Sequence, residues 1–218
     1  RQDARDVLCA RDGLTFDTLA RGATVGTGSP RRHAQIADRR PDLAVVDLRG
    51  NVDTRLGRVR DGSLDAVVLS AAGLARLGRS EAVTEVLPLD SWPTAAGQGA
   101  LAIELRAVDV AGSEVGAAVA RLADAAAADA VTAERTVLGR LEAGCSAPIG
   151  VASSLTADRA ELWAAVHRPG GGQRIERRRS VRFSPAGRRT ALLAAAEALA
   201  TELLDAGAAD LAPLGASA

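Results

Sequence analysis

The sequence has 218 residues, of which 47% are hydrophobic and 25% are charged, so it can fold around a substantial core. Its 27 basic residues, all arginine, balance 27 acidic ones, and this bulk charge argues against nucleic acid as a partner. No apolar run approaches the ~20 residues of a membrane span, and two cysteines make no disulfide framework, so we expect a cytoplasmic protein.

The first half of the chain alternates short apolar runs with helical patterns. The run "ATVGTG" over 23–28 predicts a strand, and Ser29 followed by Pro30 has the sequence of a helix start with serine as the N-cap. The same order recurs with a strand over 41–50 and a helix that Asn51 caps, and again in "LDAVVLSAAGLARLG". Repeated strand–turn–helix units predict an α/β fold with a doubly wound, mostly parallel sheet.

The pattern changes after this half. The run "PTAAGQGALAIEL" over 93–105 predicts a crossing segment in which a glycine-rich turn precedes an apolar strand. An alanine-rich helix is expected over 113–141. Beyond it, three strand patterns and a long amphipathic helix predict a small C-terminal α+β domain.

Five arginines fall at junctions between predicted strands and helices. In a doubly wound sheet, strand ends and helix starts share one edge, where ligands bind and helix N-termini contribute N–H donors. Because guanidinium groups bind carboxylates in a bidentate manner, these arginines predict a site for a polyanion. The alternative is that they are ordinary solvated helix surface. The five are Arg31, Arg32, Arg49, Arg55 and Arg76.

The two cysteines have different surroundings. Cys9 lies in the apolar run "DVLCA", where a small buried side chain is expected. Cys145 lies in "EAGCSAP", whose glycine, serine and proline are typical of a loop, where an exposed thiol can react as the thiolate. A buried structural role for Cys145 is the alternative. Neither histidine has metal-ligand spacing, and the glycine-rich segments match no nucleotide-binding motif.

Six stretches occur in one order along nearly the whole chain: "VGTGSPRR", "RRPDL", "LRGNVDTRL", "LDAVVLSAAGLARLG", "AAGQGALAIE" and "VTAERTVLGRLEAGCSAPIG". Together they resemble the porphobilinogen deaminase (hydroxymethylbilane synthase) family. The resemblance implies two lobes like those of periplasmic binding proteins and a small C-terminal α+β domain. The expected parts are a hinge from a missing first lobe (1–4), the second α/β lobe with the anion-binding arginines (5–93), a hinge and a strip of the first lobe (94–120), and the domain carrying the cofactor cysteine (121–218).

The resemblance also implies an activity and a site. The family condenses porphobilinogen stepwise into the linear tetrapyrrole hydroxymethylbilane, releases ammonia, and primes the chain with a dipyrromethane cofactor. The matching tether, through a thioether, is Cys145. The five arginines would bind carboxylates, and Thr27, Ser29, Asn51 and Gln98 would add hydrogen bonds to the cofactor. This implies a monomeric cytoplasmic transferase of porphyrin and heme biosynthesis, with no nucleic-acid or membrane partner and no metal.

Two departures from the family pattern stand out. Pro30 replaces a leucine, which the first position of a helix tolerates. The "KDVP" motif that carries the family's catalytic aspartate does not occur here. We therefore expect that an N-terminal region is missing and that this chain alone gives no turnover. The competing reading is a non-catalytic two-lobed anion-binding module, which would need no loop thiol such as Cys145.

Overall fold

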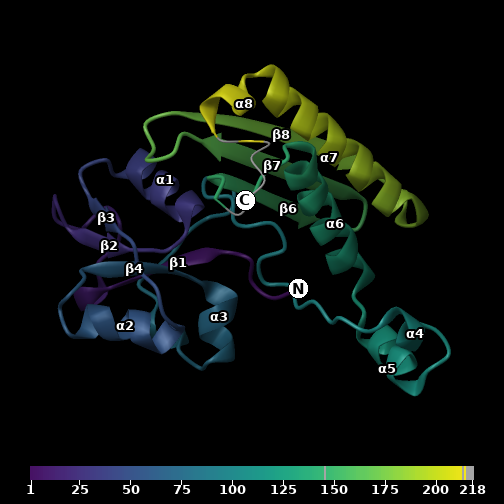
Figure 1. Cartoon of the computed structure of the whole chain (residues 1–218), viewed down its shortest axis with the longest axis horizontal. Helices are drawn as coiled ribbons and strands as arrows, with labels where there is room; N and C mark the ends of the chain where they lie inside the picture. Colours follow the sequence, from purple (N-terminus) through teal and green to yellow (C-terminus); the bar gives the residue numbers. More distant parts are fainter. Residues whose placement is uncertain (145, 213, 215–218) are drawn as a thin grey trace.

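The computed structural model describes residues 1–144, 146–212 and 214, and its first half folds around a five-stranded sheet (Figure 1). The strand order is β3-β2-β4-β1-β5. Strands β2, β3 and β4 run parallel, as predicted, whereas β1 is antiparallel to both β4 and β5. The strands are β1 (Asp6–Ala10), β2 (Thr24–Gly26), β3 (Ala44–Val46), β4 (Ala66–Ser70) and β5 (Glu85–Val86).

Helices cover both faces of this sheet, which confirms the doubly wound arrangement. Ile36 of α1 packs into the core on one face, and Leu56 of α2 and Leu74 of α3 pack on the other. Both expected N-caps form, because Ser29 accepts a hydrogen bond from the Arg32 N–H and Asn51 accepts one from the Thr54 N–H. The helices are α1 (Pro30–Arg39), α2 (Val52–Arg60) and α3 (Ala71–Arg76), with short 3₁₀ turns η1 (Arg11–Gly13) and η2 (Ser80–Ala82).

Two crossover segments, residues 1–5 and 93–106, lie side by side outside the sheet. The Gln2 N–H donates to the Gly99 carbonyl at 3.0 Å. The prediction of a strand at the end of 93–105 is wrong. Leu101 is 74% exposed, and no described strand lies beside this segment to accept and donate backbone hydrogen bonds. Two helices follow and project away from the sheet (Figure 1): α4 (Ala107–Val110) and α5 (Glu114–Leu122).

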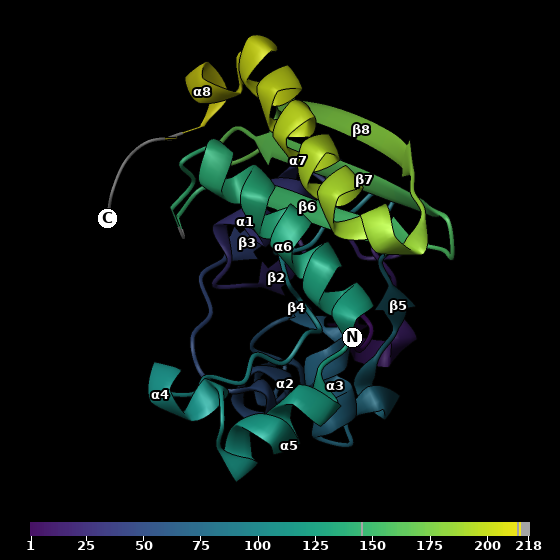
Figure 2. The same ribbon diagram turned by 90° about the vertical axis from the view of Figure 1, so that its right-hand side faces the viewer.

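The C-terminal domain is an antiparallel sheet in the order β6-β7-β8, with α6 and α7 on one face (Figure 2). Val137 of α6, Leu162 of β7 and Leu199 of α7 share its core. The single helix expected over 113–141 is two helices, because the Asp124 side chain caps the start of α6 at the Ala127 N–H. The elements are α6 (Ala125–Arg140), β6 (Ile149–Leu155), β7 (Arg159–His167), β8 (Arg174–Arg182), η3 (Pro185–Gly187), α7 (Arg188–Asp205) and α8 (Ala208–Leu211).

The C-terminal domain contacts the crossover segments through a buried carboxylate. Glu134 of α6 accepts hydrogen bonds from the Arg1 guanidinium, the Gly97 N–H and the Ser153 hydroxyl. Close by, the Val151 N–H donates to the Thr94 carbonyl at 2.8 Å. Among the helices of the described residues, none is long and apolar enough to cross a bilayer.

Candidate anion-binding site

Asp6, the first residue of β1, lies fully buried at the centre of a hydrogen-bonded group that we call the Asp6 cluster. Its Oδ2 atom accepts hydrogen bonds from Arg31 Nη1 at 2.9 Å and Trp92 Nε1 at 3.0 Å. Its Oδ1 atom accepts from Arg32 Nη2 at 2.6 Å and Gln98 Nε2 at 2.9 Å. The start of α1, the start of β1 and a crossover segment therefore meet at one carboxylate.

The charges in the Asp6 cluster do not cancel. Burial alone would raise the pKa of Asp6, but the charges of Arg31 and Arg32, with hydrogen bonds from Arg32 and Gln98, hold that pKa well below its usual range. Burial lowers the pKa of Arg31, and the charge of Asp6 opposes this effect. Arginine side chains stay protonated in proteins. Two cations thus share one anion, which leaves one positive charge.

The two arginines differ in what their donors contact. Arg31 is 5% exposed, and its Nη1 atom also contacts the Gln35 side chain at 2.7 Å and the Pro93 carbonyl at 3.2 Å. Arg32 donates from Nη1 to the Val68 carbonyl at 3.2 Å, and its buried Nε–H has no partner among the described residues. Arg32 therefore holds one buried donor without an acceptor among the described residues.

The predicted residues before α1 and α2 lie on neighbouring loops. Thr27 is 4% exposed; its Oγ1 accepts from the Ser29 N–H at 3.2 Å, and its carbonyl accepts from the Leu48 N–H at 3.3 Å. A Cβ at Gly28 would lie 2.7 Å from the Leu48 carbonyl oxygen, so this close approach requires glycine. The structure thus places Thr27 and Ser29 against the loop that leads to Arg49 and Asn51.

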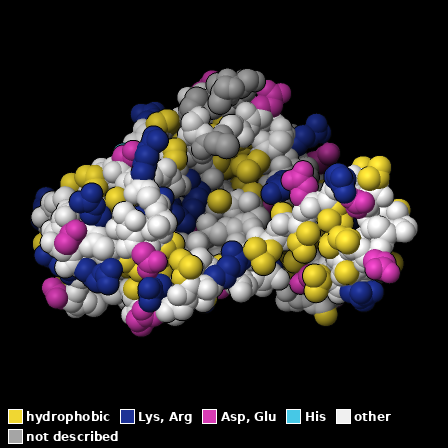
Figure 3. All heavy atoms as spheres, turned by 60° about the horizontal axis from the view of Figure 1, so that its bottom comes forward, with side chains coloured by type: hydrophobic (Ala, Val, Ile, Leu, Met, Phe, Trp, Pro, Cys, Tyr) yellow, Lys and Arg dark blue, Asp and Glu magenta, His cyan; other side chains and the backbone are white. Residues whose placement is uncertain are grey.

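The other predicted arginines are more open. Arg49 has a 93% exposed side chain, 3.6 Å from the Asp47 carboxylate, and Arg55 donates from Nε to the Gly50 carbonyl at 2.9 Å. Arg76, in the last turn of α3, lines a different cavity of about 690 Å³, together with Arg1 and Arg135. Figure 3 shows basic side chains on the α/β-lobe side of a central hollow. Four of the five arginines therefore lie near the starts of α1 and α2, and Arg76 faces the crossover.

Cys145, the predicted tether, lies outside the described residues. Its neighbours Gly144 and Ser146 belong to the connection between α6 and β6, in agreement with the predicted loop. Cys9 is a buried free thiol in β1, as expected, and burial raises its pKa to about 12. The described residues hold no group of three or more His, Cys, Asp or Glu side chains that could bind a metal ion.

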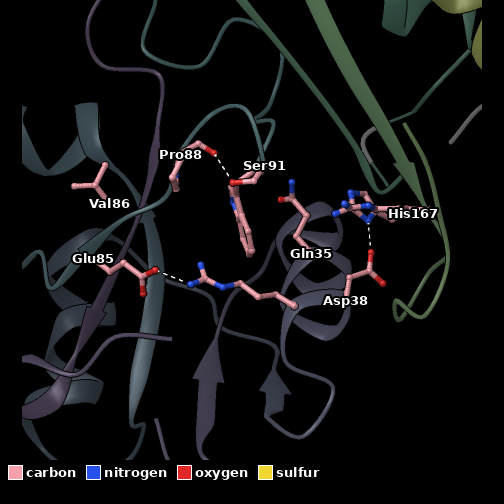
Figure 4. A pocket seen from close by; sticks show the side chains of 10 residues that line it. Gln35, Asp38, Glu85, Val86, Pro88, Ser91 and His167 are labelled. Carbon is pink, nitrogen blue, oxygen red and sulfur yellow. Dashed lines mark hydrogen bonds and ion pairs between the residues drawn. The ribbon is translucent and has the colours of Figure 1, made fainter. Parts of the chain in front are cut away.

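A second polar contact lines a cavity of about 380 Å³ between α1 and the C-terminal domain (Figure 4). His167 Nδ1 at the end of β7 lies 2.5 Å from Asp38 Oδ2, and Asp38 Oδ1 accepts from the Gly172 N–H at 2.6 Å. Burial lowers the pKa of His167 although Asp38 opposes it, and the buried Nε2 atom has no partner among the described residues. This contact joins the two domains.

Sequence reasoning missed the acidic member of both contacts. Asp6 is the first residue of the apolar run "DVLCA". This position was a usable signal, because a carboxylate at the start of a buried strand needs a cationic or hydrogen-bonding partner. Asp38 and His167 are 129 residues apart, and no local pattern relates them.

Comparison with known proteins gives the family. Residues 1–114 match the family model "Porphobilinogen deaminase, dipyromethane cofactor binding domain", and residues 128–203 match "Porphobilinogen deaminase, C-terminal domain". A solved Salmonella typhimurium periplasmic binding protein with high arginine specificity overlaps 57% of each chain at 19% identity and a TM-score of 0.36, an overlap too weak to carry an argument.

Three curated relatives are named porphobilinogen deaminase. The protein of Leifsonia xyli subsp. xyli is 51% identical over 98% of this chain and 66% of its own length. The Thermobifida fusca protein is 53% identical over 83% of this chain and 56% of its own length. The Cutibacterium acnes protein is 48% identical over 100% of this chain and 70% of its own length. The chain thus spans 56–70% of the length of these relatives, and it belongs to the porphobilinogen deaminase family.

Proposed function

We propose that this chain provides the cofactor- and substrate-binding part of a porphobilinogen deaminase, a transferase that joins porphobilinogen units into hydroxymethylbilane and releases ammonia. The observation that carries the proposal is the Asp6 cluster, where two guanidinium groups face one carboxylate at the strand ends of the lobe. Each pyrrole unit of the substrate brings an acetate and a propionate. Surplus guanidinium charge is the chemistry that binds them.

The residues present fit a dipyrromethane cofactor. Arg32 keeps a buried Nε–H without a partner among the described residues, and it lies in the first turn of α1, which Ser29 caps and Thr27 precedes. When bound, a dipyrromethane supplies the free pyrrole carbon to which the first substrate is joined. Arg32 and Arg49 would hold its carboxylates, and Asn51, Arg55 and Gln98 would contribute further polar contacts at the same edge.

We propose Cys145 as the thioether tether on the basis of the family resemblance. The flanking residues Gly144 and Ser146 lie in the connection that follows α6. Glu134 of the same helix accepts a hydrogen bond from the Gly97 N–H of the crossover segment. A tether there would place the growing pyrrole chain on a part of the protein separate from the arginine-bearing lobe.

The tether is tested by replacing the matched region of the Leifsonia xyli enzyme with this chain. We expect the chimera to form hydroxymethylbilane and to carry the mass of one dipyrromethane, located at Cys145 by peptide mass spectrometry. Cys145→Ser should lose both the mass and the turnover, whereas the matched control Cys9→Ser should keep both. A folded chimera at its bare mass, beside an active parent enzyme, would favour the non-catalytic anion-binding module.

The carboxylate role of the arginines is tested in the same chimera. Arg32→Gln should lower kcat/KM by about 10- to 100-fold, because one charge-assisted hydrogen bond is lost. Arg58→Gln, on the exposed side of α2, is the matched control and should leave kcat/KM unchanged. Equal effects of the two changes would remove the carboxylate argument.

We also propose the division into 1–4, 5–93, 94–120 and 121–218, with 94–120 belonging to another lobe. Large apolar side chains of this strip are exposed, including Leu101, Ile103 and Val108. We further propose a monomer that acts in the cytoplasm, without a nucleic-acid or membrane partner. The zero net charge and the free thiol of Cys9 support this, and light scattering of the chimera should give the mass of one chain.

A further inference from the structure

Strand β8 lies at the outer border of the C-terminal sheet, with β7 as its one neighbour among the described strands (Figure 2). In the ladder with β7, the Phe183 N–H donates to the Asp158 carbonyl at 2.9 Å, and the antiparallel pattern alternates from there. Every second residue of β8 therefore directs its backbone N–H and C=O groups away from the sheet. These residues are Arg174, Glu176, Arg178, Ser180 and Arg182. Among the described residues, the one hydrogen bond on this side of the backbone runs from Arg177 Nη1 to the Glu176 carbonyl, at 2.8 Å.

A groove of about 510 Å³ lies between β8 and α7. Its α7 side carries short side chains, those of Ala191, Ala194 and Ala195, which leave the space open. Its charged lining includes the ion pair of Arg179 with Glu202, whose side-chain atoms lie 3.3 Å apart. The groove thus offers room for the side chains that an added strand would direct toward α7.

The same edge carries a surplus of positive charge. Five of the nine residues of β8 are arginines and one is a glutamate. Glu176 and Glu202 neutralise part of this charge through ion pairs with neighbouring arginines. Arg177 and Arg182 are exposed and pair with no carboxylate of the described residues. Cationic side chains and unpaired backbone groups therefore coincide along one strand.

We propose that the β8 edge binds an extended acidic segment of a partner protein, which adds to the C-terminal sheet as a fourth strand. The backbone of that segment pairs with the outward N–H and C=O groups of β8, as in other complexes formed by strand addition. Its side chains alternate between two faces. Small apolar side chains enter the groove beside α7, and carboxylates on the opposite face lie across from Arg178 and Arg182.

The two other candidate occupants fit this edge less well. A second copy of β8 would place arginines opposite arginines, which destabilises strand pairing. Nucleic acid would supply phosphate oxygens to the guanidinium groups, but phosphates only accept hydrogen bonds and leave the outward carbonyls of β8 without donors. An acidic peptide matches both the charge and the backbone pattern.

The first test measures the binding of two fluorescein-labelled seven-residue peptides to the 218-residue chain by fluorescence anisotropy. One peptide alternates glutamate with valine, and the other alternates lysine with valine. We expect saturable binding of the glutamate peptide and at least ~10-fold weaker binding of the lysine peptide, because the charge of β8 attracts one and repels the other. Absence of binding by the glutamate peptide, or equal binding of the two, overturns the proposal.

The second test separates strand addition from attraction by charge alone. Ser180→Pro removes an outward backbone N–H, whereas the matched control Ser180→Ala keeps it. Ser180→Pro should bind the glutamate peptide about 10-fold more weakly than Ser180→Ala, because one backbone hydrogen bond is lost and the proline ring blocks close approach. Equal affinities of the two folded variants overturn the proposal.

The third test decides the matter if Ser180→Pro does not fold. Arg177→Glu combined with Arg182→Glu should weaken binding of the glutamate peptide by at least ~10-fold. Arg58→Glu combined with Arg60→Glu makes the same change of net charge at exposed positions of α2 and should leave the affinity unchanged. Equal losses in the two double variants overturn the proposal, as does a single-stranded oligonucleotide that binds the wild type more tightly than the glutamate peptide does.

Discussion

The Asp6 cluster and the His167–Asp38 contact both place a carboxylate beside a buried basic side chain, but Asp6 is fully buried and Asp38 is 12% exposed. Asp6 faces two guanidinium groups that keep their charge, and its carboxylate oxygens accept four donors. Asp38 faces an imidazole that can be neutral, and His167 Nε2 is left without a partner among the described residues. The first contact depends on fixed charge, and the second depends on a group that can give up its proton.

Removal of each carboxylate is the strongest way to break this comparison. Asp6→Asn should cost about 3–5 kcal/mol of unfolding free energy, because two buried guanidinium groups lose their only anion in the cluster. Asp38→Asn should cost about 1 kcal/mol, because an amide can still hydrogen-bond a neutral imidazole. Urea unfolding at pH 7 measures both changes. Asp17→Asn, at the surface, should stay within about 1 kcal/mol of the wild type, and equal costs at Asp6 and Asp38 would refute the contrast.

The pH dependence of stability sharpens the comparison with a smaller effect. Burial lowers the pKa of His167 below 6.5, Asp38 of α1 opposes this, and Arg174 of β8 and Arg31 of α1 add to it. As the pH falls, the imidazole of His167 is therefore protonated in the unfolded chain before it is protonated in the folded chain. The contribution of His167 to the unfolding free energy is fully present above pH 6.5 and decreases below it, by at most about 1.4 kcal/mol per pH unit. Arg39 and Glu85 line the same cavity and pair with each other.

Unfolding between pH 7 and pH 5 checks this expectation. His167→Gln should flatten the curve, and His33→Gln, at an exposed position, should leave it as in the wild type. Asp6 acts in another range, because a lowered carboxyl pKa contributes stability above pH 3.8 that is lost only in stronger acid. A wild-type curve that is flat from pH 7 to pH 5 would contradict the account of His167.

Much of the fold follows from local signals in the sequence. Ser29, Pro30 and Asn51 marked two helix starts because capping is decided within one turn. The apolar run over 99–105 did not form a strand, since a strand needs a neighbour that local sequence does not supply. The break between α5 and α6 had a signal in the sequence, because Asp124 is a residue type that caps helices. The prediction instead followed the high helix propensity of the surrounding alanines.

The candidate site was only partly predictable. Topology alone selected five arginines. The structure places Arg31, Arg32, Arg49 and Arg55 near the starts of two helices, and Arg76 at a different cavity. Topology could not predict that both Arg31 and Arg32 donate to Asp6, or that Arg31 also donates to the Pro93 carbonyl, because these acceptors lie 25 to 62 residues away. Contacts of that sequence separation depend on the completed fold.

Strand β8 forms one edge of the C-terminal sheet, and five of its nine residues are arginines: Arg174, Arg177, Arg178, Arg179 and Arg182. Two copies brought together along this strand would set guanidinium groups against one another before any backbone bond could form. Extension of the sheet by edge-to-edge pairing with further chains is thereby opposed electrostatically, and the edge needs no proline or covering helix for this protection. High salt screens such repulsion, so pairing of β8 with a strand of another chain would be least opposed at high ionic strength.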